Sequence, residues 1–259
     1  YQIFIWSSIL FNKENKKRFS LKEFYKNNGY IIIPGSDFLS TEEHERLLKV
    51  SEELTNKTTK DSRWQFNSNG TINKLQGAAA FEPQFLKLAK NKRLIEIAQS
   101  ISNIGTNVDC FISKFFPQQK NGSSTLWHQD NNYFNGSPND IISCAVYLTD
   151  TNKENGCLRI AKGTHNLPEL LPHTSSKLYD GIKWISDDVI NEYKIIDLIQ
   201  TGPYAVFFNI NIAHGCYTNT TDNNRYSLAW EYISSKNTNV GDSEHVQYDR
   251  TLVTPKFII

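Results

Sequence analysis

The sequence lacks the features typical of membrane-anchored, secreted or disulfide-rich proteins. No apolar run approaches the roughly 20 residues of a membrane-spanning helix, so no membrane partner is expected. The apolar segment 1–11 is followed, not preceded, by basic residues, which is the wrong order for a signal peptide. No CxxC pair is present, and the absence of close pairs predicts free thiols in a reducing compartment and a cytoplasmic location. The cysteines are Cys110, Cys144, Cys157 and Cys216.

Neither sign of charge is in excess, since 28 Lys and Arg residues oppose 27 Asp and Glu residues. Nucleic acids are bound largely by clustered basic side chains, so this balance argues against a nucleic-acid partner and favours a small-molecule substrate. No repeat or low-complexity linker divides the chain, and its length suits one large domain over residues 1–259. The oligomeric state is not indicated by the sequence.

The first hundred residues are predicted to be mainly helical, with a helical flank over about 20–103. Ser40 begins a Ser-Thr-Glu-Glu capping box that precedes an apolar-periodic helix. A single helix is expected over 83–101. Residues 30–34, Tyr-Ile-Ile-Ile-Pro, have the composition of a short buried strand. Residues 58–80 show no periodicity and are predicted to form a loop.

After residue 104, short runs of β-branched and aromatic residues alternate with turn signals such as Asn155-Gly156. The expected strands are 106–116, 141–149, 157–161, 194–199, 204–210 and 225–233. Many short strands beside a helical flank predict an all-β core with flanking helices, in the form of a double-stranded β-helix, the cupin-like jelly roll. This core is expected over about 104–235.

A His-x-Asp pair is the strongest indication of chemistry. If the segment is extended, His128 and Asp130 leave the same face of the strand because side chains alternate. His214 lies 84 residues beyond Asp130, after the apolar run 205–208. Two imidazoles and one carboxylate form the facial triad of non-haem Fe(II) oxygenases and leave three positions for a 2-oxoacid and O2. The pattern predicts that these three residues bind Fe(II).

An Arg-x-Ser pair follows the second histidine and suits a carboxylate ligand. On a strand, Arg225 and Ser227 would point the same way, and a guanidinium binds a carboxylate through two parallel hydrogen bonds. Together with the metal site, this pair predicts 2-oxoglutarate as cosubstrate. Lys114 could also reach the cosubstrate carboxylate; the alternative is a solvated lysine at a strand end.

Two other classes of function use parts of the same pattern. A non-catalytic jelly-roll binding protein would keep the fold without needing a complete triad or the Arg225 anchor. A zinc hydrolase could use His128, Asp130 and His214 but would have no need of Arg225. A His-x-Asp pair alone is common by chance, so the combination of all four residues is what favours the oxygenase.

Residues 127–173 resemble the phytanoyl-CoA dioxygenase family, and segments 24–48 and 205–225 are also similar to it. The matching motifs are Trp127-His128-Gln129-Asp130, Tyr133-Phe134, Asp140-Ile141-Ile142-Ser143-Cys144-Ala145, Glu154-Asn155-Gly156-Cys157-Leu158, Gly163-Thr164-His165 and Leu171-Pro172-His173.

The resemblance implies a dioxygenase that uses Fe(II), 2-oxoglutarate and O2 to oxidise an unactivated C–H bond of a small molecule. Hydroxylation is the usual outcome, and desaturation, cyclisation or epimerisation are the alternatives. It also implies that His128, Asp130 and His214 bind iron and that Arg225 binds the C5 carboxylate of 2-oxoglutarate. Cys216 stands where the family often has serine, which weakens one expected cosubstrate contact.

Substrate contacts are expected from aromatic residues that flank the ligand-bearing strands, namely Tyr133, Phe134 and Trp230. For Tyr133 and Trp230 the alternative is an ordinary place in the core. Arg63 and Trp64 are expected to offer a cation and an aromatic face to the substrate from a covering loop. The segments 58–80 and 118–126 are predicted to form this cover.

Overall fold

The computed structural model describes residues 3–6, 9–12, 17–58, 60–122, 124–175, 183–237, 240 and 250–254. Its helices are α1 (Leu21–Asn28), α2 (Thr41–Asn56), α3 (Ala78–Phe81), α4 (Pro83–Ala89), α5 (Lys92–Ile101), α6 (Asn131–Phe134) and α7 (Asp187–Ile190). Its strands in the first half are β1 (Ile3–Trp6), β2 (Ile9–Asn12), β3 (Lys17–Ser20), β4 (Tyr30–Pro34), β5 (Trp64–Phe66), β6 (Ile72–Gln76) and β7 (Val108–Gln118). The later strands are β8 (Ile141–Tyr147), β9 (Leu158–Ala161), β10 (Thr174–Ser175), β11 (Lys183–Trp184), β12 (Ile195–Asp197), β13 (Tyr204–Asn209), β14 (His214–Cys216), β15 (Arg225–Ser234) and β16 (Arg250–Leu252).

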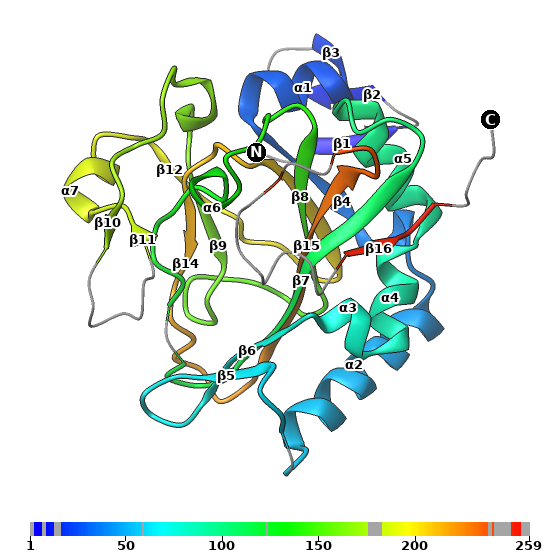
Figure 1. The fold of residues 1–259 in the computed structure, drawn as a ribbon, viewed down its shortest axis with the longest axis vertical. Helices are drawn as coiled ribbons and strands as arrows, with labels where there is room; N and C mark the ends of the chain where they lie inside the picture. The colour runs from blue at the N-terminus through cyan, green and yellow to red at the C-terminus, as the bar shows by residue number, and fades with distance from the viewer. Residues whose placement is uncertain are drawn as a thin grey trace.

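Two antiparallel sheets form the framework (Figure 1). In the large sheet the strand order is β4-β13-β8-β15-β7-β6-β5, and β16 pairs with β7. The small sheet has the order β12-β9-β14, and a backbone bridge between His128 and His214 adds the segment around His128 to it. Two facing antiparallel sheets of this kind make the double-stranded β-helix that the sequence predicted.

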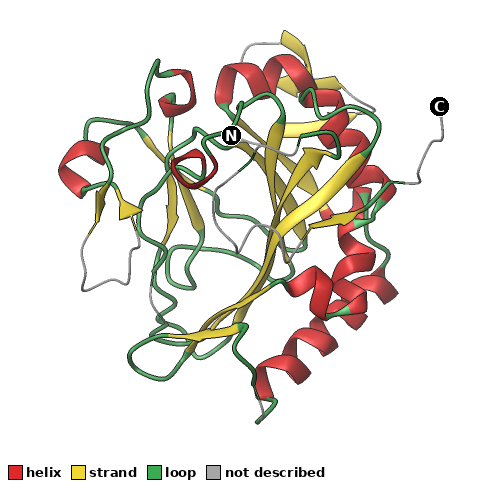
Figure 2. Cartoon of the chain, in the orientation of Figure 1, coloured by secondary structure: helices red, strands yellow, loops and turns green. Residues whose placement is uncertain are grey.

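The large sheet is covered on both faces, and the alternation of side chains along its strands serves two cores. On β13, Ala205 and Phe207 pack toward the helices, whereas Tyr204, Val206 and Phe208 pack toward the small sheet. This is why the strand reads as one continuous apolar run instead of a polar–apolar alternation. Helices cover one face, and the space between the two sheets lies on the other (Figure 2).

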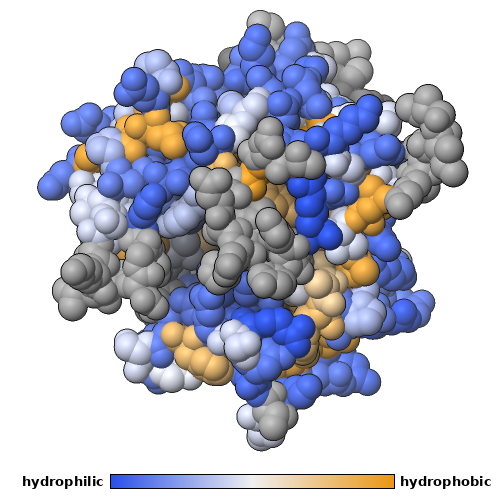
Figure 3. Space-filling model, in the orientation of Figure 1, coloured by the Kyte–Doolittle hydropathy of each residue, from blue (hydrophilic) through white to orange (hydrophobic). Residues whose placement is uncertain are grey.

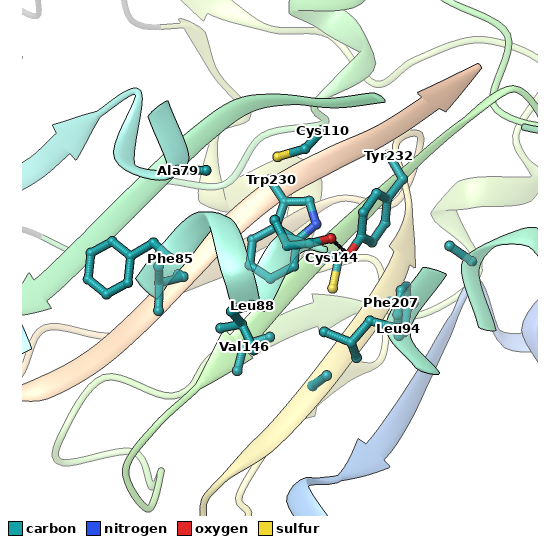
Figure 4. Close-up of a cluster of buried hydrophobic side chains, with 14 of the residues drawn as sticks. Ala79, Phe85, Leu88, Leu94, Cys110, Cys144, Val146, Phe207, Trp230 and Tyr232 are labelled. Atoms are coloured by element: carbon teal, nitrogen blue, oxygen red, sulfur yellow. Dashed lines mark hydrogen bonds between the residues drawn. The ribbon is translucent and has the colours of Figure 1, made fainter. Parts of the chain in front are cut away.

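The core beneath the helices is rich in aromatic and branched side chains (Figure 4). It brings together Phe85, Leu88 and Leu94 from the helical segment with Cys144, Val146, Phe207, Trp230 and Tyr232 from the sheet. The Tyr232 hydroxyl donates a hydrogen bond to the Ala89 carbonyl at 2.7 Å, so this polar group is satisfied inside the core. The packed helices hold the sheet rigid behind the space where the two sheets face each other.

Several local predictions are confirmed. The Ser40 hydroxyl accepts from the Glu43 amide at 3.1 Å, and the Glu43 carboxylate accepts from the Ser40 amide at 3.2 Å, so the capping box begins α2 as expected. The strand at 30–34 is β4. The six strands predicted after residue 104 are present as β7, β8, β9, β12, β13 and β15, with ends within two residues of those expected. The strand β14 was not predicted, because its sequence His-Gly-Cys has no β-branched or aromatic residue.

Two predictions about the first hundred residues are wrong. Residues 58–80 are not one loop, since they contain β5, β6 and α3, with Trp64 and Leu75 buried in the core. The single helix expected over 83–101 is two helices, α4 and α5. Besides the expected β4, the region supplies β5 and β6 to the large sheet. Elements as short as β5, β6 and α3 show no hydrophobic period, and they lack the run of branched apolar residues that reveals β4.

The described part of the chain has no helix that is long and apolar enough to cross a membrane. The face of the molecule shown in Figure 3 is mostly hydrophilic, and its apolar side chains lie in small separate groups. Isolated apolar groups are normal on a protein surface, so the described residues seen on this face form no extended apolar patch.

We expect Asn91→Ala to lower the free energy of unfolding by about 1–2 kcal/mol. Asn91 starts α5: its side-chain oxygen accepts from the Arg93 and Leu94 amides at 3.0 and 3.3 Å, and its amide group donates to the Phe38 carbonyl at 2.7 Å. Urea unfolding measures the change. Asn91→Asp keeps the acceptor for the helix amides and should recover part of the loss; an alanine variant as stable as the parent would contradict this cap.

Candidate active site

The two histidines of the predicted triad are joined through their backbones. The His128 amide donates to the His214 carbonyl and the His214 amide donates to the His128 carbonyl, both at 3.0 Å. This antiparallel bridge brings residues far apart in the chain into register, and the two imidazole centroids lie 4.3 Å apart. Asp130 follows two residues after His128, immediately before α6. The bridge and the turn into α6 together direct all three side chains to one point.

The potential ligand atoms of His128, Asp130 and His214 all lie within 4.8 Å of one another. The Asp130 Oδ1 atom is 3.4 Å from Nε2 of His128 and 3.8 Å from Nε2 of His214. In each histidine, Nδ1 lies at hydrogen-bond distance from a backbone carbonyl two residues earlier, Leu126 at 2.8 Å and Ile212 at 3.0 Å. A carbonyl only accepts, so Nδ1 carries a proton in both rings, and Nε2 is the nitrogen that faces the carboxylate.

The charges at the triad favour metal binding. Burial, together with the neighbouring His128, lowers the pKa of His214 to about 4, although the Asp130 carboxylate opposes this change. Burial alone would raise the pKa of Asp130, but His214 and His128 outweigh it and hold that pKa well below its usual range. At neutral pH the site therefore contains an ionised carboxylate and a neutral His214 imidazole, which are the protonation states that bind a divalent metal.

Ser143 fixes the orientation of the carboxylate. Its hydroxyl donates to Asp130 Oδ2 at 2.7 Å, which leaves Oδ1 toward the two imidazoles. Ser143 is buried on β8, in the large sheet, whereas the histidines belong to the small sheet. The contact therefore ties the triad to the opposite wall. Sequence reasoning missed this role, because it depends on how the two sheets face each other.

Gln129 lies between two ligands and points away from them, as expected of an alternating segment. Its side-chain amide donates to the Asn211 carbonyl at 2.5 Å, and its side-chain oxygen accepts from the Leu171 amide at 2.8 Å. Its backbone amide donates to Nε2 of His173 at 3.1 Å, while His173 Nδ1 donates to the Leu171 carbonyl at 2.8 Å. These contacts hold the ligand segment in place from behind.

The triad forms part of the wall of a cavity between the two sheets, which is partly open to solvent. Its lining combines polar and charged groups with apolar side chains: Lys114, Phe116, Thr125, Ser143, Ala145, Tyr147, Leu158, Phe208, Cys216, Arg225, Ser227, Ala229 and Glu231 lie around the three triad residues. Four residues predicted to contact the cosubstrate, Lys114, Cys216, Arg225 and Ser227, are therefore brought into one cavity with the triad.

Arg225 is a buried cation with neutral neighbours. One guanidinium nitrogen donates to Ser227 Oγ at 3.2 Å, another donates to the side-chain oxygen of Gln118, and the group lies 4.9 Å from the Tyr147 ring centroid. Its Nε atom is buried without a hydrogen-bond partner. Among the described residues no carboxylate lies within ion-pair distance of Arg225. Because an uncompensated buried charge is costly, this cation fits an anionic ligand that enters the cavity.

The residues predicted to contact substrate are placed in different environments. Tyr133 is half exposed, its ring lies 6.3 Å from that of His128, and its hydroxyl donates to the Lys183 carbonyl at 3.1 Å. Phe134 is buried against Phe111, with ring centroids 5.5 Å apart. Tyr133 therefore lies beside the triad, whereas Phe134 supports α6 from the core.

Trp230, Arg63 and Trp64 do not present their side chains to the cavity. Trp230 borders it from its strand, but its ring packs in the core under the helices, 5.7 Å from that of Tyr232 (Figure 4). Trp64 is buried against Phe81, and Arg63 is paired with an aspartate beside it. Segment 58–80 thus contains β5, β6 and the start of α3, and none of its described residues lines the cavity. From 118–126, Thr125 lines the cavity and residue 123 lies outside the described residues.

Inside the jelly roll, a His-x-Asp pair meets a distal histidine. This arrangement defines a class of metal-binding double-stranded β-helix proteins. Within that class the chain belongs to the phytanoyl-CoA dioxygenase family, whose model matches residues 25–227. A relative from Rattus norvegicus, the peroxisomal phytanoyl-CoA dioxygenase, is 27% identical over 237 residues, covering 83% of this chain and 68% of the relative. The resemblance noted from the motifs is therefore confirmed over most of the chain.

Solved structures share the fold. The nonhaem α-ketoglutarate-dependent epimerase SnoN from nogalamycin biosynthesis superposes with a TM-score of 0.66 at 20% identity, covering 83% of this chain and 82% of the other. EctD from S. alaskensis, solved with 2-oxoglutarate and 5-hydroxyectoine, gives the same TM-score and identity, covering 82% and 74% of the two chains. At this identity, the likeness shows a common architecture.

We expect Ser143→Ala to weaken Fe(II) binding roughly 10-fold, because the carboxylate of Asp130 loses the hydrogen bond that orients it. An anaerobic Fe(II) titration measures the affinity. The matched control is Ser113→Ala: Ser113 is equally buried, but its hydroxyl accepts from the Ala79 amide away from the triad. It should lower stability without changing iron affinity, and equal iron affinity in both variants would contradict the role of Ser143.

Proposed function

We propose that this protein is an Fe(II)- and 2-oxoglutarate-dependent oxygenase that oxidises an unactivated C–H bond of a small organic molecule. The observation that carries the proposal is the pairing, in one cavity, of a three-ligand metal cluster with Arg225, a buried cation that has no carboxylate partner among the described residues. A zinc hydrolase would use the cluster but not the cation, and a binding protein would need neither in this arrangement. Family membership supports the same conclusion.

The residues present fit Fe(II). Two imidazole nitrogens and one carboxylate oxygen match the donor set of non-haem iron sites. When bound, the iron would couple reduction of O2 to oxidative decarboxylation of 2-oxoglutarate, giving succinate and CO2, with one oxygen atom inserted into the substrate C–H bond. Ser143 and the backbone contacts of the two histidines would hold the ligands in place as the cosubstrate binds.

The chain's own residues would bind and orient the cosubstrate. Arg225 would pair with one carboxylate of 2-oxoglutarate through its guanidinium, and Ser227 would donate or accept beside it. Tyr147 packs against the guanidinium and against Tyr204, with ring centroids 4.9 Å apart, and so keeps that end of the cavity rigid and dry. Cys216 lines the same wall and would contact the cosubstrate more weakly than a serine.

We propose hydroxylation as the outcome, since it is the usual result of this chemistry. The relative from Rattus norvegicus is named a dioxygenase and the SnoN structure an epimerase, so the fold supports more than one outcome. We also propose that the chain acts as a single domain and works in the cytoplasm, consistent with four free, buried cysteines. The rat relative is named peroxisomal, and imaging of the tagged protein distinguishes the two locations.

We expect His128→Ala, Asp130→Ala and His214→Ala each to abolish turnover and lower the iron content, because too few protein donors remain to hold the metal. Metal analysis after anaerobic loading and a 2-oxoglutarate consumption assay measure both effects. His165→Ala is the matched control, since His165 contacts the Lys26 carbonyl at 3.1 Å and is not in the triad. Near-normal activity in any triad variant would remove that residue from the site.

We expect Arg225→Met to raise the KM for 2-oxoglutarate tens to hundreds of fold, because losing a charge-assisted paired contact costs roughly 2–4 kcal/mol. Iron affinity should change much less. Arg225→Lys keeps the charge without the planar fork and should fall between the two, while Arg46→Met on the surface should match the parent. An unchanged KM would show that another cation anchors the cosubstrate.

A further inference from the structure

A buried ion pair lines the cavity and has no role in the proposed chemistry. Lys114 on β7 and Glu231 on β15 lie with Nζ and Oε1 3.8 Å apart. The Glu231 side chain is 3% exposed and that of Lys114 is 19% exposed, and both residues border the same cavity as the triad. Ion pairs between such groups usually lie at the surface, so their place in the cavity wall requires an explanation.

The pair lies in the part of the cavity away from the cosubstrate anchor. Arg225 and Glu231 are six residues apart on one strand, which corresponds to roughly 20 Å between their backbones. A five-carbon dicarboxylic acid is much shorter than that distance. Glu231 is instead opposite Ser143 on β8, and the Ser143 hydroxyl binds the metal ligand Asp130. Glu231 therefore flanks the triad on the side that remains for the substrate.

A β-bulge shapes the backbone at this point. The register of β15 against β7 shifts between Ala229 and Glu231, so that Ala229 faces Lys114 while Glu231 faces Phe111. On β7, Ile112 and Ser113 lie where β15 has only Trp230, and the φ of 50° at Ile112 is unfavourable for a β-branched side chain. Bulges next to active sites redirect side chains, and backbone strain of this kind persists where the surrounding structure enforces it. On β7 the strained Ile112 lies between Phe111, which pairs with Glu231, and Lys114 itself.

The charges around the pair do not serve stability alone. A buried ion pair is often no more stabilising than apolar residues of the same size, because both ions lose water. A second lysine, Lys74, lies close enough that burial and Lys114 lower its pKa to about 8, while Glu231 opposes the change. An ammonium has three donors and a carboxylate about four acceptor positions, so each of these groups can bind more than one partner at a time.

We propose that Lys114 and Glu231 bind a zwitterionic head group of the substrate, of the α-amino acid type, and thereby determine specificity. Glu231 would accept hydrogen bonds from the substrate ammonium, and Lys114 would donate to its carboxylate. Two opposite charges side by side match the adjacent ammonium and carboxylate of such a molecule, whereas a purely apolar substrate would cover both ions without pairing either. The rest of the substrate would extend toward the triad. This inference rests on the proposed oxygenase function.

The first arm of the test uses the wild-type protein with Fe(II), 2-oxoglutarate and O2. Succinate release is measured with each of the proteinogenic L-amino acids and with the N-acetyl and carboxamide derivative of each. At least one free amino acid should raise succinate release clearly above the substrate-free rate, and its two derivatives should be much poorer. Stimulation by none of the free amino acids, or equal stimulation by the derivatives, would overturn the proposal.

The second arm uses Glu231→Gln and Lys114→Met, which remove charge with little change of shape. Each should raise the KM for the stimulating amino acid about tenfold or more, whereas the KM for 2-oxoglutarate should change far less. The matched control is Glu43→Gln with Lys87→Met, an ion pair at 2.9 Å on the surface of the helices, which should leave both KM values unchanged.

The outcomes separate this proposal from the function on which it rests. If the wild-type protein consumes no 2-oxoglutarate under any condition, the oxygenase function itself fails. If 2-oxoglutarate is consumed but Glu231→Gln has the parent's KM for the amino acid, only the head-group site is wrong. A rise in the KM for 2-oxoglutarate in Lys114→Met would assign that lysine to the cosubstrate and likewise overturn the paired site.

Discussion

The antiparallel backbone bridge between His128 and His214 is the contact on which the site depends. Its two hydrogen bonds, each 3.0 Å long, join segments more than 80 residues apart and bring two imidazoles within 4.3 Å of each other. Asp130 follows within the same segment, and Ser143 reaches it from the opposite sheet. Without the bridge, no local feature would bring the histidines together. The metal cluster is therefore a property of the small sheet, held against the large one.

The large sheet makes this arrangement possible because its strands serve two cores at once. Side chains on one face pack beneath α4 and α5, and those on the other face the cavity, so each strand supplies both stability and chemistry. On β15 the alternation places Arg225, Ser227 and Glu231 toward the cavity and Trp230 in the core. A shift of one residue in register would exchange the two sets of side chains, so the register of this strand fixes the identity of the site.

Local sequence signals predicted much of the architecture. They failed where an element is short or where a residue's place depends on which face of a strand it occupies. The capping box at Ser40 acts through hydrogen bonds within one turn, so sequence reveals it directly. Trp64 lies on a three-residue strand and is buried by Phe81, so a region without periodicity was mistaken for a loop. Asn91 divides one expected helix into two. Its side-chain oxygen caps α5 and its side-chain amide donates to the Phe38 carbonyl, a contact that no helical period shows. Trp230 was expected to contact the substrate. Side chains alternate along β15, however, and this alternation directs its ring into the core beneath the helices.

By itself the sequence determined the kinds of groups and their local geometry. His128 and Asp130 are two residues apart, so in an extended segment their side chains point to the same face. The same holds for Arg225 and Ser227, because alternation along a strand depends only on neighbouring residues. Only the tertiary structure decided which of these faces meet. The bridge to His214, the hydrogen bond from Ser143 and the approach of Lys114 to Glu231 all join segments distant in the chain. Their geometry is set by sheet pairing and by a bulge, and no local period encodes either.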